Sequence, residues 1–276
     1  MRNNESYRFP RRGLHRALVL GVVFLLGGIG NLAAVISAED SSRADFWKKS
    51  FGKVMAEGRV PIVVFDIEGT LVDNRPRTCA ILKKFVEEKG NAYPDVAPRI
   101  RNLRADSVQY HLVDTFQDCG ISNLFVLEHA LKFWADRFFS NRFLRFDTAI
   151  PGAVAFVNRL WKSGAMIVYL TGRDKPSMFS GTAGELEHLG FPIGVERTML
   201  IMKPKPKAPA APFKNEAAGF IERLGTVVAA FDDSMRNIEV YRKRWPEARI
   251  VQMRRPGQAR PPQREGVEVW DGFPRP

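Results

Sequence analysis

Three apolar stretches of this 276-residue chain each end in side chains that can do chemistry. They are residues 62–65, 165–170 and 226–231. The polar residues that follow them are Asp66 and Glu68, then Thr171 and Gly172, then Asp232 and Asp233. Apolar strands do not normally deliver two carboxylates to their ends, because burying an unpaired charge is costly. We therefore assign these residues to chemistry rather than to stability.

The elements that must position these residues are strands of a parallel sheet. Short apolar runs bounded by turn signals indicate strands that are buried on both faces. Strand patterns alternate with helical patterns over residues 59–75 and 150–253, which predicts an α/β fold with helices on both faces of a parallel sheet. Ligands bind at the carboxyl ends of the strands in such sheets, so we expect the polar residues to meet there.

Two further residues belong to the predicted site. Lys214 is expected at the start of a helix over residues 213–224, just before the third apolar stretch. Asn237 follows Asp233 by four residues, in a helix predicted over residues 235–245. Thr171 and Gly172 are expected to form a turn directly after the second strand.

Residues 76–149 carry no strong pattern for a buried strand. Helical spacing of apolar residues predicts helices over 78–89 and 123–139, while residues 106–119 are ambiguous. The predicted organisation is a core made of residues 39–75 and 150–276, interrupted by a mostly helical insert over residues 76–149.

The residue types fit transfer of a phosphoryl group to a carboxylate. Asp66 would attack phosphorus and form an aspartyl-phosphate. Mg²⁺ suits a site of carboxylates and substrate oxygens, and its expected ligands are Asp66, Asp233 and the backbone carbonyl of Glu68. Asp232 is expected to ligate the metal or to support it together with Asn237. Thr171, Gly172 and Lys214 would bind and neutralise the phosphoryl oxygens.

In these motifs the chain resembles the haloacid dehalogenase-like hydrolase superfamily. The resemblance rests on Asp66-x-Glu68-Gly-Thr70, Thr171-Gly172, Lys214 and Asp232-Asp233, and spans about residues 60–253. It implies a Rossmann-like three-layer core, a helical cap inserted after the first motif, and Mg²⁺-dependent phosphatase activity. The form of the second and last motifs is similar to that of exported acid-phosphatase-like members.

Glu68 departs from the pattern of this superfamily, in which an aspartate at that position protonates the leaving oxygen and later activates water. Glutamate keeps the carboxylate but is one methylene longer. We predict a Mg²⁺-dependent phosphatase that hydrolyses small phosphate monoesters. Two alternatives stay open at this point: a catalytically silent member that binds a phosphate ligand, and a phosphotransferase that passes the group to an alcohol.

The first 38 residues are typical of an export signal. Five arginines precede an uncharged run over residues 17–38, which ends in small residues before Glu39. The 22 uncharged residues of this run are also enough for a membrane anchor. Cleaved or anchored, this signal predicts a periplasmic or secreted bacterial protein, tethered to the inner membrane only if residues 17–38 are retained.

The chain is basic, with a formal net charge of +12. Removal of residues 1–38, with their five arginines and one glutamate, would leave +8, which favours anionic substrates. The sequence holds no specific nucleic-acid-binding motif, and a small phosphorylated substrate is the expected partner. Cys79 and Cys119 are the only cysteines, and the sequence allows either one disulfide or two separate thiols. The substrate's identity and the oligomeric state are not encoded in these patterns.

Overall fold

The computed structural model describes residues 45–206, 208–255 and 257–274. The chain divides into two compact units, residues 1–49 and residues 50–276. Of the first unit only residues 45–49 are described, and they are helical. The predicted export signal or anchor over residues 1–38 lies outside the described residues. All elements discussed below belong to the second unit.

Six of the described strands form one parallel sheet in the order β5-β4-β1-β6-β7-β8, which confirms the predicted α/β fold class. These strands are β1 (Pro61–Phe65), β4 (Met166–Asp174), β5 (Thr198–Lys203), β6 (Thr226–Asp232), β7 (Arg249–Met253) and β8 (Glu268–Trp270). β1 lies in the middle, between β4 and β6, and all five of its residues are buried. The central strand therefore delivers Asp66 to the middle of the sheet's carboxyl edge.

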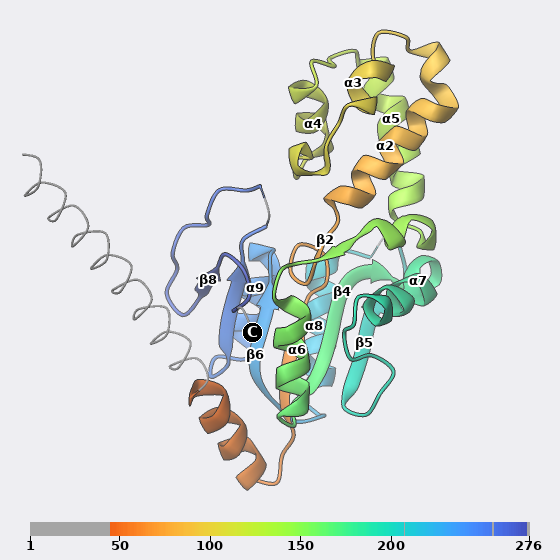
Figure 1. Ribbon diagram of the computed structural model, residues 1–276. Helices are drawn as coiled ribbons and strands as arrows, with labels where there is room; N and C mark the ends of the chain where they lie inside the picture. The colour runs from red at the N-terminus through yellow and green to blue at the C-terminus, as the bar shows by residue number, and fades with distance from the viewer. Residues whose placement is uncertain (1–44, 207, 256, 275–276) are drawn as a thin grey trace, which may run out of the picture. The chain divides into compact units, whose positions relative to one another are not determined.

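Helices cover both faces of the sheet. Figure 1 shows α6 (Ala153–Lys162) on the near face and α8 (Ala210–Ile221) on the far face, with α9 (Met235–Arg244) beside it. Alternate residues of β1 point to opposite faces, as the pleat requires. Ile62 and Val64 pack in the cluster under α8 and α9, while the Phe65 ring stacks on Phe231 and lies against α6. The remaining core helix is α7 (Lys175–His188), which packs against β4 and β5.

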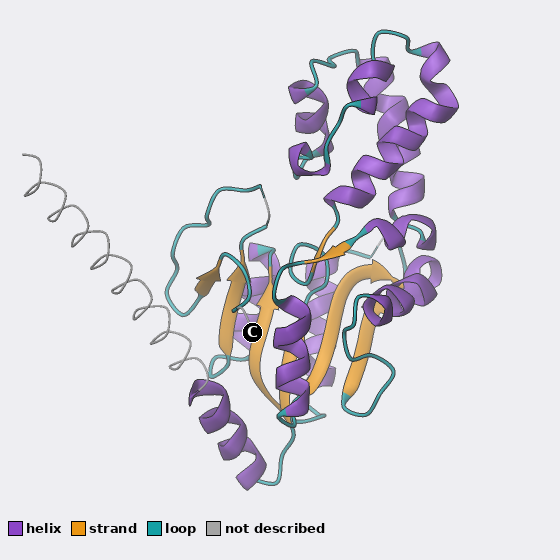
Figure 2. Ribbon diagram, in the orientation of Figure 1, coloured by secondary structure: helices purple, strands orange, loops and turns teal. Residues whose placement is uncertain are grey.

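The insert, which lies between β1 and α6, is mostly helical and has a short strand pair at its base (Figure 2). The pair is β2 (Val72–Asp73) and β3 (Thr148–Ala149), which are antiparallel. Between them lie α2 (Arg75–Lys89), η1 (Gly90–Ala92), α3 (Ala97–Arg101), η2 (Ala105–Ser107), α4 (Leu112–Asp118), α5 (Leu124–Phe138) and η3 (Asn141–Phe146). The helical insert is confirmed, whereas its exact boundaries stay predictions.

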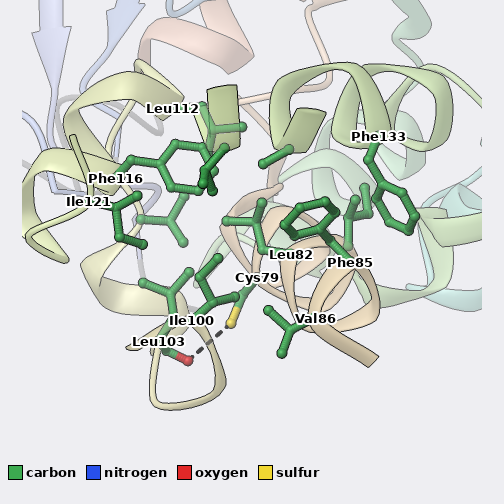
Figure 3. Packing of buried hydrophobic residues seen from close by; sticks show 14 of the residues in the cluster. Cys79, Leu82, Phe85, Val86, Ile100, Leu103, Leu112, Phe116, Ile121 and Phe133 are labelled. Atoms are coloured by element: carbon green, nitrogen blue, oxygen red, sulfur yellow. Dashed lines mark hydrogen bonds between the residues drawn. The ribbon is translucent and has the colours of Figure 1, made fainter. Parts of the chain in front are cut away.

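The insert has a hydrophobic core of its own (Figure 3). Phe85 of α2 is 2% exposed and lies against Phe133 of α5, with 5.4 Å between the ring centroids. Leu82, Ile100 and Phe116 come from α2, α3 and α4 and pack into the same cluster. The start of α5 is fixed by Asn123, whose side chain accepts hydrogen bonds from the backbone of Phe125 and Val126. Four helices are thus held together independently of the sheet's own core.

Two local expectations were wrong. β4 does not end in a turn at Thr171 but continues to Asp174, with an irregular register against β5 between these two residues. Lys214 does not open its helix, because α8 begins at Ala210 and places Lys214 in the second turn. For β4, pairing with β5 extends the strand beyond the local pattern.

Cys79 and Cys119 are free thiols, and Cys79 Sγ lies 3.2 Å from the carbonyl oxygen of Leu103. Of the alternatives left open by the sequence, two separate thiols describe this structure. No helix within the described residues has the length and apolar character needed to cross a membrane.

We expect Phe85→Ala to lower the free energy of unfolding by about 3–5 kcal/mol, because it leaves a cavity in the insert's core. Urea denaturation followed by circular dichroism measures the loss. Phe220→Ala is the control, since Phe220 is 40% exposed on α8, and it should cost less than about 1 kcal/mol. Equal losses for the two variants would contradict a packed core in the insert.

Candidate active site

The carboxyl ends of β1, β4 and β6 meet at one cavity of about 350 Å³, which we call the acidic cavity. The predicted site residues that line it are Asp66, Glu68, Thr171, Gly172, Lys214, Asp233 and Asn237. Asp232 lies at the end of β6, fully buried next to them. The structure therefore brings together residues that are up to 171 positions apart in the sequence.

Lys214 forms the central contact of this site. Its ammonium donates to Asp66 Oδ1 and to Asp232 Oδ2, each at 2.6 Å, and the side chain is 1% exposed. Burial lowers the pKa of Lys214, but Asp232 and Asp66 outweigh it and raise the pKa well above its usual value. Lys214 therefore stays charged, and it ties α8 to the ends of β1 and β6.

Asp66 has an unusual environment for a carboxylate. Burial raises its pKa to about 7, Lys214 acts in the opposite direction, and Asp232 adds to the increase. One lysine therefore does not fully compensate two buried carboxylates. A further cation at this point would favour the ionised form of Asp66.

Asp232 is saturated with hydrogen-bond donors. Besides Lys214, its oxygens accept from the backbone of Ser234 at 2.9 Å, from Asn237 Nδ2 at 3.0 and 3.1 Å and from the Tyr241 hydroxyl at 3.1 Å. Its lone pairs are thus committed to protein groups. This arrangement favours a supporting role for Asp232, which positions Lys214, over direct metal ligation.

The donor set fits a hard divalent cation such as Mg²⁺. One carboxylate oxygen of each of Asp66, Asp232 and Asp233 lies within 4.8 Å of the others, and of the three only Asp232 is saturated by protein donors. Oxygen-only donors of this kind suit Mg²⁺. The backbone also approaches closely: Gly69 has φ +74°, and a Cβ there would collide with the Asp233 carboxylate. Asp66 and Asp233, with the Glu68 carbonyl, are the groups that would hold the ion.

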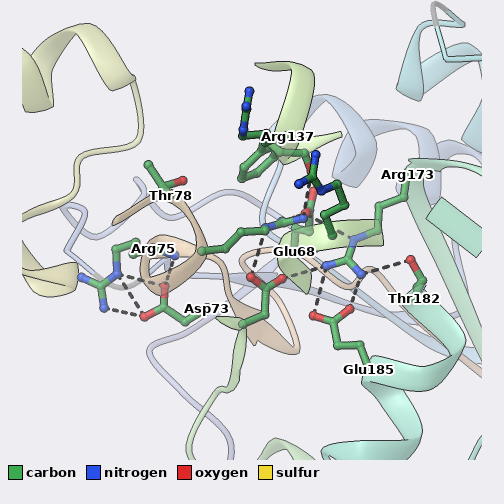
Figure 4. Close-up of polar contacts among 12 residues, drawn as sticks. Glu68, Asp73, Arg75, Thr78, Arg137, Arg173, Thr182 and Glu185 are labelled. Carbon is green, nitrogen blue, oxygen red and sulfur yellow. Dashed lines mark hydrogen bonds and ion pairs between the residues drawn. The ribbon is translucent and has the colours of Figure 1, made fainter. Parts of the chain in front are cut away.

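Glu68 is held by two arginines of different elements (Figure 4). Arg77 of α2 and Arg173 of β4 both donate to its Oε1, the latter at 3.3 Å. Burial raises the pKa of Glu68, but these two guanidinium groups outweigh it and lower the pKa to about 2. The glutamate side chain is thus fixed in direction and strongly ionised at the mouth of the acidic cavity.

The two arginines extend this contact into a buried network. Asp147, just before β3, pairs with Arg77 at 3.1 Å and with Arg173 at 3.0 Å. Arg173 also contacts Glu185 of α7 and donates to Thr182 at 3.2 Å. The Arg173 side chain is 1% exposed and links the insert's base to the core.

Thr171 and Gly172 line the acidic cavity from the irregular part of β4. The Thr171 hydroxyl accepts a hydrogen bond from the backbone of Arg173 at 3.2 Å. This contact fixes the direction of the hydroxyl at the wall of the acidic cavity, which Asp66 and Asp233 also line. The two residues lie where a strand-end ligand site is expected, although in a strand rather than in a turn.

Arg255 lines the acidic cavity and was not among the predicted site residues. It follows β7, forms an ion pair with Asp233 Oδ2, and places its guanidinium 3.8 Å from the centre of the Tyr110 ring in the insert. Burial is the main reason that its pKa is lowered. The signal was present, because Arg254-Arg255 directly follows an apolar strand pattern, as Asp66 does. No local pattern marked Arg77 or Glu185.

No protein-family model matches this chain, and no curated protein matches it. Solved structures with a similar course of the chain include a haloacid dehalogenase-like hydrolase from Streptococcus pneumoniae, with 17% identity and a TM-score of 0.45 over 72% of this chain and 87% of that one. A putative phosphatase from Clostridium difficile has 12% identity and a TM-score of 0.48, and the match covers 71% of this chain and 85% of that one. A class C acid phosphatase from Bacillus anthracis has 17% identity and a TM-score of 0.36, and the match covers 68% of this chain and 62% of that one. At these values the matches carry no conclusion about activity.

We expect Arg255→Ala to raise the affinity for Mg²⁺ by at least about fivefold, because it removes a cation that contacts one of the assigned ligands. Titration calorimetry on the apoprotein measures the dissociation constant.

Arg75→Ala is the matched control for this measurement. Its side chain is 20% exposed, as that of Arg255 is, but it pairs with Asp73 instead. An unchanged or weaker affinity in Arg255→Ala would argue against Asp233 as a ligand.

Proposed function

We propose that this chain is a Mg²⁺-dependent phosphatase of the haloacid dehalogenase-like superfamily, acting on small phosphate monoesters. The observation that carries the proposal is the convergence of Asp66, Lys214 and Asp233 on one cavity at the carboxyl edge of a parallel sheet. The order of the four motifs in the sequence and the helical insert after the first motif add to this support.

In the proposed reaction Asp66 is the nucleophile. Lys214 holds Oδ1 of Asp66, so we assign Oδ2 to the attack on phosphorus. A bond forms between this oxygen and phosphorus, while the bond from phosphorus to the ester oxygen breaks. The ester oxygen takes a proton from the solvent as the alcohol leaves, and the attacking water of the second step returns one to the solvent. Water then attacks the phosphorus of the aspartyl-phosphate, which releases inorganic phosphate and regenerates the carboxylate.

The remaining groups neutralise and orient the phosphoryl group. Lys214 and the Thr171 hydroxyl line the cavity in which its oxygens would lie, and positioned charge of this kind supplies most of the catalysis in phosphoryl transfer. A bound Mg²⁺ would neutralise charge between Asp66 and the substrate oxygens. Glu68 would direct water or the leaving group from the adjoining wall, fixed by Arg77 and Arg173.

The second candidate function is a phosphate-binding protein without turnover. The observation in its favour is the ion pairing of Glu68, which commits one oxygen of the carboxylate to two arginines. Export through residues 1–38 and a periplasmic or secreted location are part of the proposal for either function, and they rest on the sequence alone.

We expect residues 39–276 to release inorganic phosphate from phosphate monoesters with Mg²⁺ and not with EDTA. Asp66→Asn should lower kcat by at least about 10³-fold, because the covalent route is lost. Asp95→Asn, at an exposed position of the insert, is the control and should leave kcat unchanged. Full turnover with EDTA, or in Asp66→Asn, would refute the proposed mechanism.

A second comparison separates the enzyme from the binding protein. We expect Glu68→Asp to lower kcat by about 10²-fold, since the shorter side chain reaches the two arginines and the substrate less well. Glu196→Asp is the control, because the Glu196 side chain is 89% exposed. A gain of activity in Glu68→Asp over an inactive parent would instead support the binding protein, with a metal site silenced by the longer residue.

A further inference from the structure

A second cavity, of about 370 Å³, adjoins the acidic cavity and has no role in the chemistry above. The two cavities share Glu68, Asp233 and Arg255 as lining residues. We call the second one the aromatic cavity, because the insert contributes four aromatic side chains to its lining. They are Tyr110, Trp134, Phe138 and Phe139. Its volume lies in the range of small-molecule sites, which is about 300–1,000 Å³.

The aromatic wall is rigidly built. The Trp134 ring stacks on Phe138 at 4.4 Å, and Phe139 meets Phe138 edge to face at 5.1 Å. The indole of Trp134 donates to the Thr78 hydroxyl at 3.2 Å, and the Arg77 guanidinium lies 3.9 Å from the centre of the Phe138 ring. These contacts fix the wall through the same arginine that holds Glu68.

Part of this aromatic surface is uncovered. Phe139 is 53% exposed and Tyr110 is 59% exposed, although both line a cavity rather than a flat surface. Exposed aromatic side chains that line a concave site are a common sign of ligand binding. A flat ring of the ligand can pack against them, and the aromatic surfaces of both then leave water.

The carboxylates and guanidinium groups that line the aromatic cavity already have partners. Asp73 pairs with Arg75 at 2.7 Å, and Glu68 with Arg77 and Arg173 (Figure 4). Asp233 pairs with Arg255. A second charged group on a ligand would have to break one of these pairs. The cavity is therefore suited to an uncharged group, with Thr78, Gln109 and His111 available for polar edges.

We propose that the aromatic cavity binds the leaving group of the phosphate ester, and that this group carries a flat, uncharged aromatic ring. The inference rests on the proposed function, because it takes the phosphoryl group to lie in the adjoining acidic cavity. It assigns Phe139 as a residue that determines specificity. Aryl phosphates and nucleoside monophosphates both have the required ring close to the phosphate.

The test is a binding measurement that does not need turnover. Titration calorimetry with Mg²⁺ compares phenylphosphonate with methylphosphonate, two non-hydrolysable compounds that differ in the aromatic ring. We expect phenylphosphonate to bind at least about tenfold more tightly, because the ring leaves water for the aromatic wall.

Phe139→Ala should abolish most of this preference and leave the affinity for methylphosphonate unchanged, while Phe139→Trp should retain it. Phe179→Ala is the matched control, since Phe179 is 47% exposed on α7 and does not line either cavity. Phe139 is exposed, so its replacement should not affect folding. Equal affinities for the two phosphonates, or a preference that survives in Phe139→Ala, would overturn the inference while leaving a phosphatase possible.

If neither phosphonate binds, the phosphate site of both candidate functions is refuted and the inference falls with it. If phenylphosphonate binds more tightly but no phosphate ester is turned over, the phosphatase proposal fails while the ring preference of the aromatic cavity stands. A turnover panel distinguishes the two sources of the ring. Phenyl phosphate is compared with glycerol phosphate, and adenosine 5′-monophosphate with ribose 5-phosphate. A higher kcat/KM for the aromatic member of either pair supports the inference and names the source, whereas a higher value for both aliphatic members contradicts it.

Discussion

The site depends on the ion pairs that the buried ammonium of Lys214 forms with Asp66 and Asp232. A lysine that is 1% exposed would be costly without partners, and two carboxylates at 2.6 Å supply them. Asp66 comes from the end of β1 and Asp232 from the end of β6, so the contact joins the two central strands to α8. Loss of the lysine would leave two carboxylates facing each other in a buried site. The position of Asp66 and the packing of α8 therefore depend on the same contact.

A second set of charges connects the insert to this centre. Arg77 lies where the chain enters the insert, and Asp147 lies where it returns. Asp147 pairs with Arg173 and with Arg77, and Arg77 also pairs with Glu68. Such buried pairs do not add much stability over apolar residues, but breaking one costs about 3–5 kcal/mol because a charge is left uncompensated. Their effect is to hold the Glu68 side chain in one position beside the acidic cavity.

The sequence predicted what depends on local pattern. Apolar runs followed by polar residues predicted the strands β1, β4 and β6. Polar residues after each of these runs line one cavity, as expected. The extension of β4 to Asp174 was missed, because it depends on pairing with β5 and not on the residues themselves. Arg77 was missed for a similar reason: nothing in the pattern of α2 shows that its guanidinium reaches a loop nine residues earlier.

Arg255 shows that the expectation for polar residues after apolar strands also holds for β7, where it was not applied. β7 delivers this arginine to the same edge of the sheet at which β1 and β6 deliver aspartates, so the C-terminal segment contributes the cation that the acidic cluster lacks. Because the guanidinium also lies against Tyr110, it stands where the acidic and aromatic cavities meet. Anything that binds Asp233 must compete with Arg255, and any movement of Arg255 changes the wall of the aromatic cavity. The charge around Asp233 and the shape of the aromatic cavity are consequently linked through one side chain.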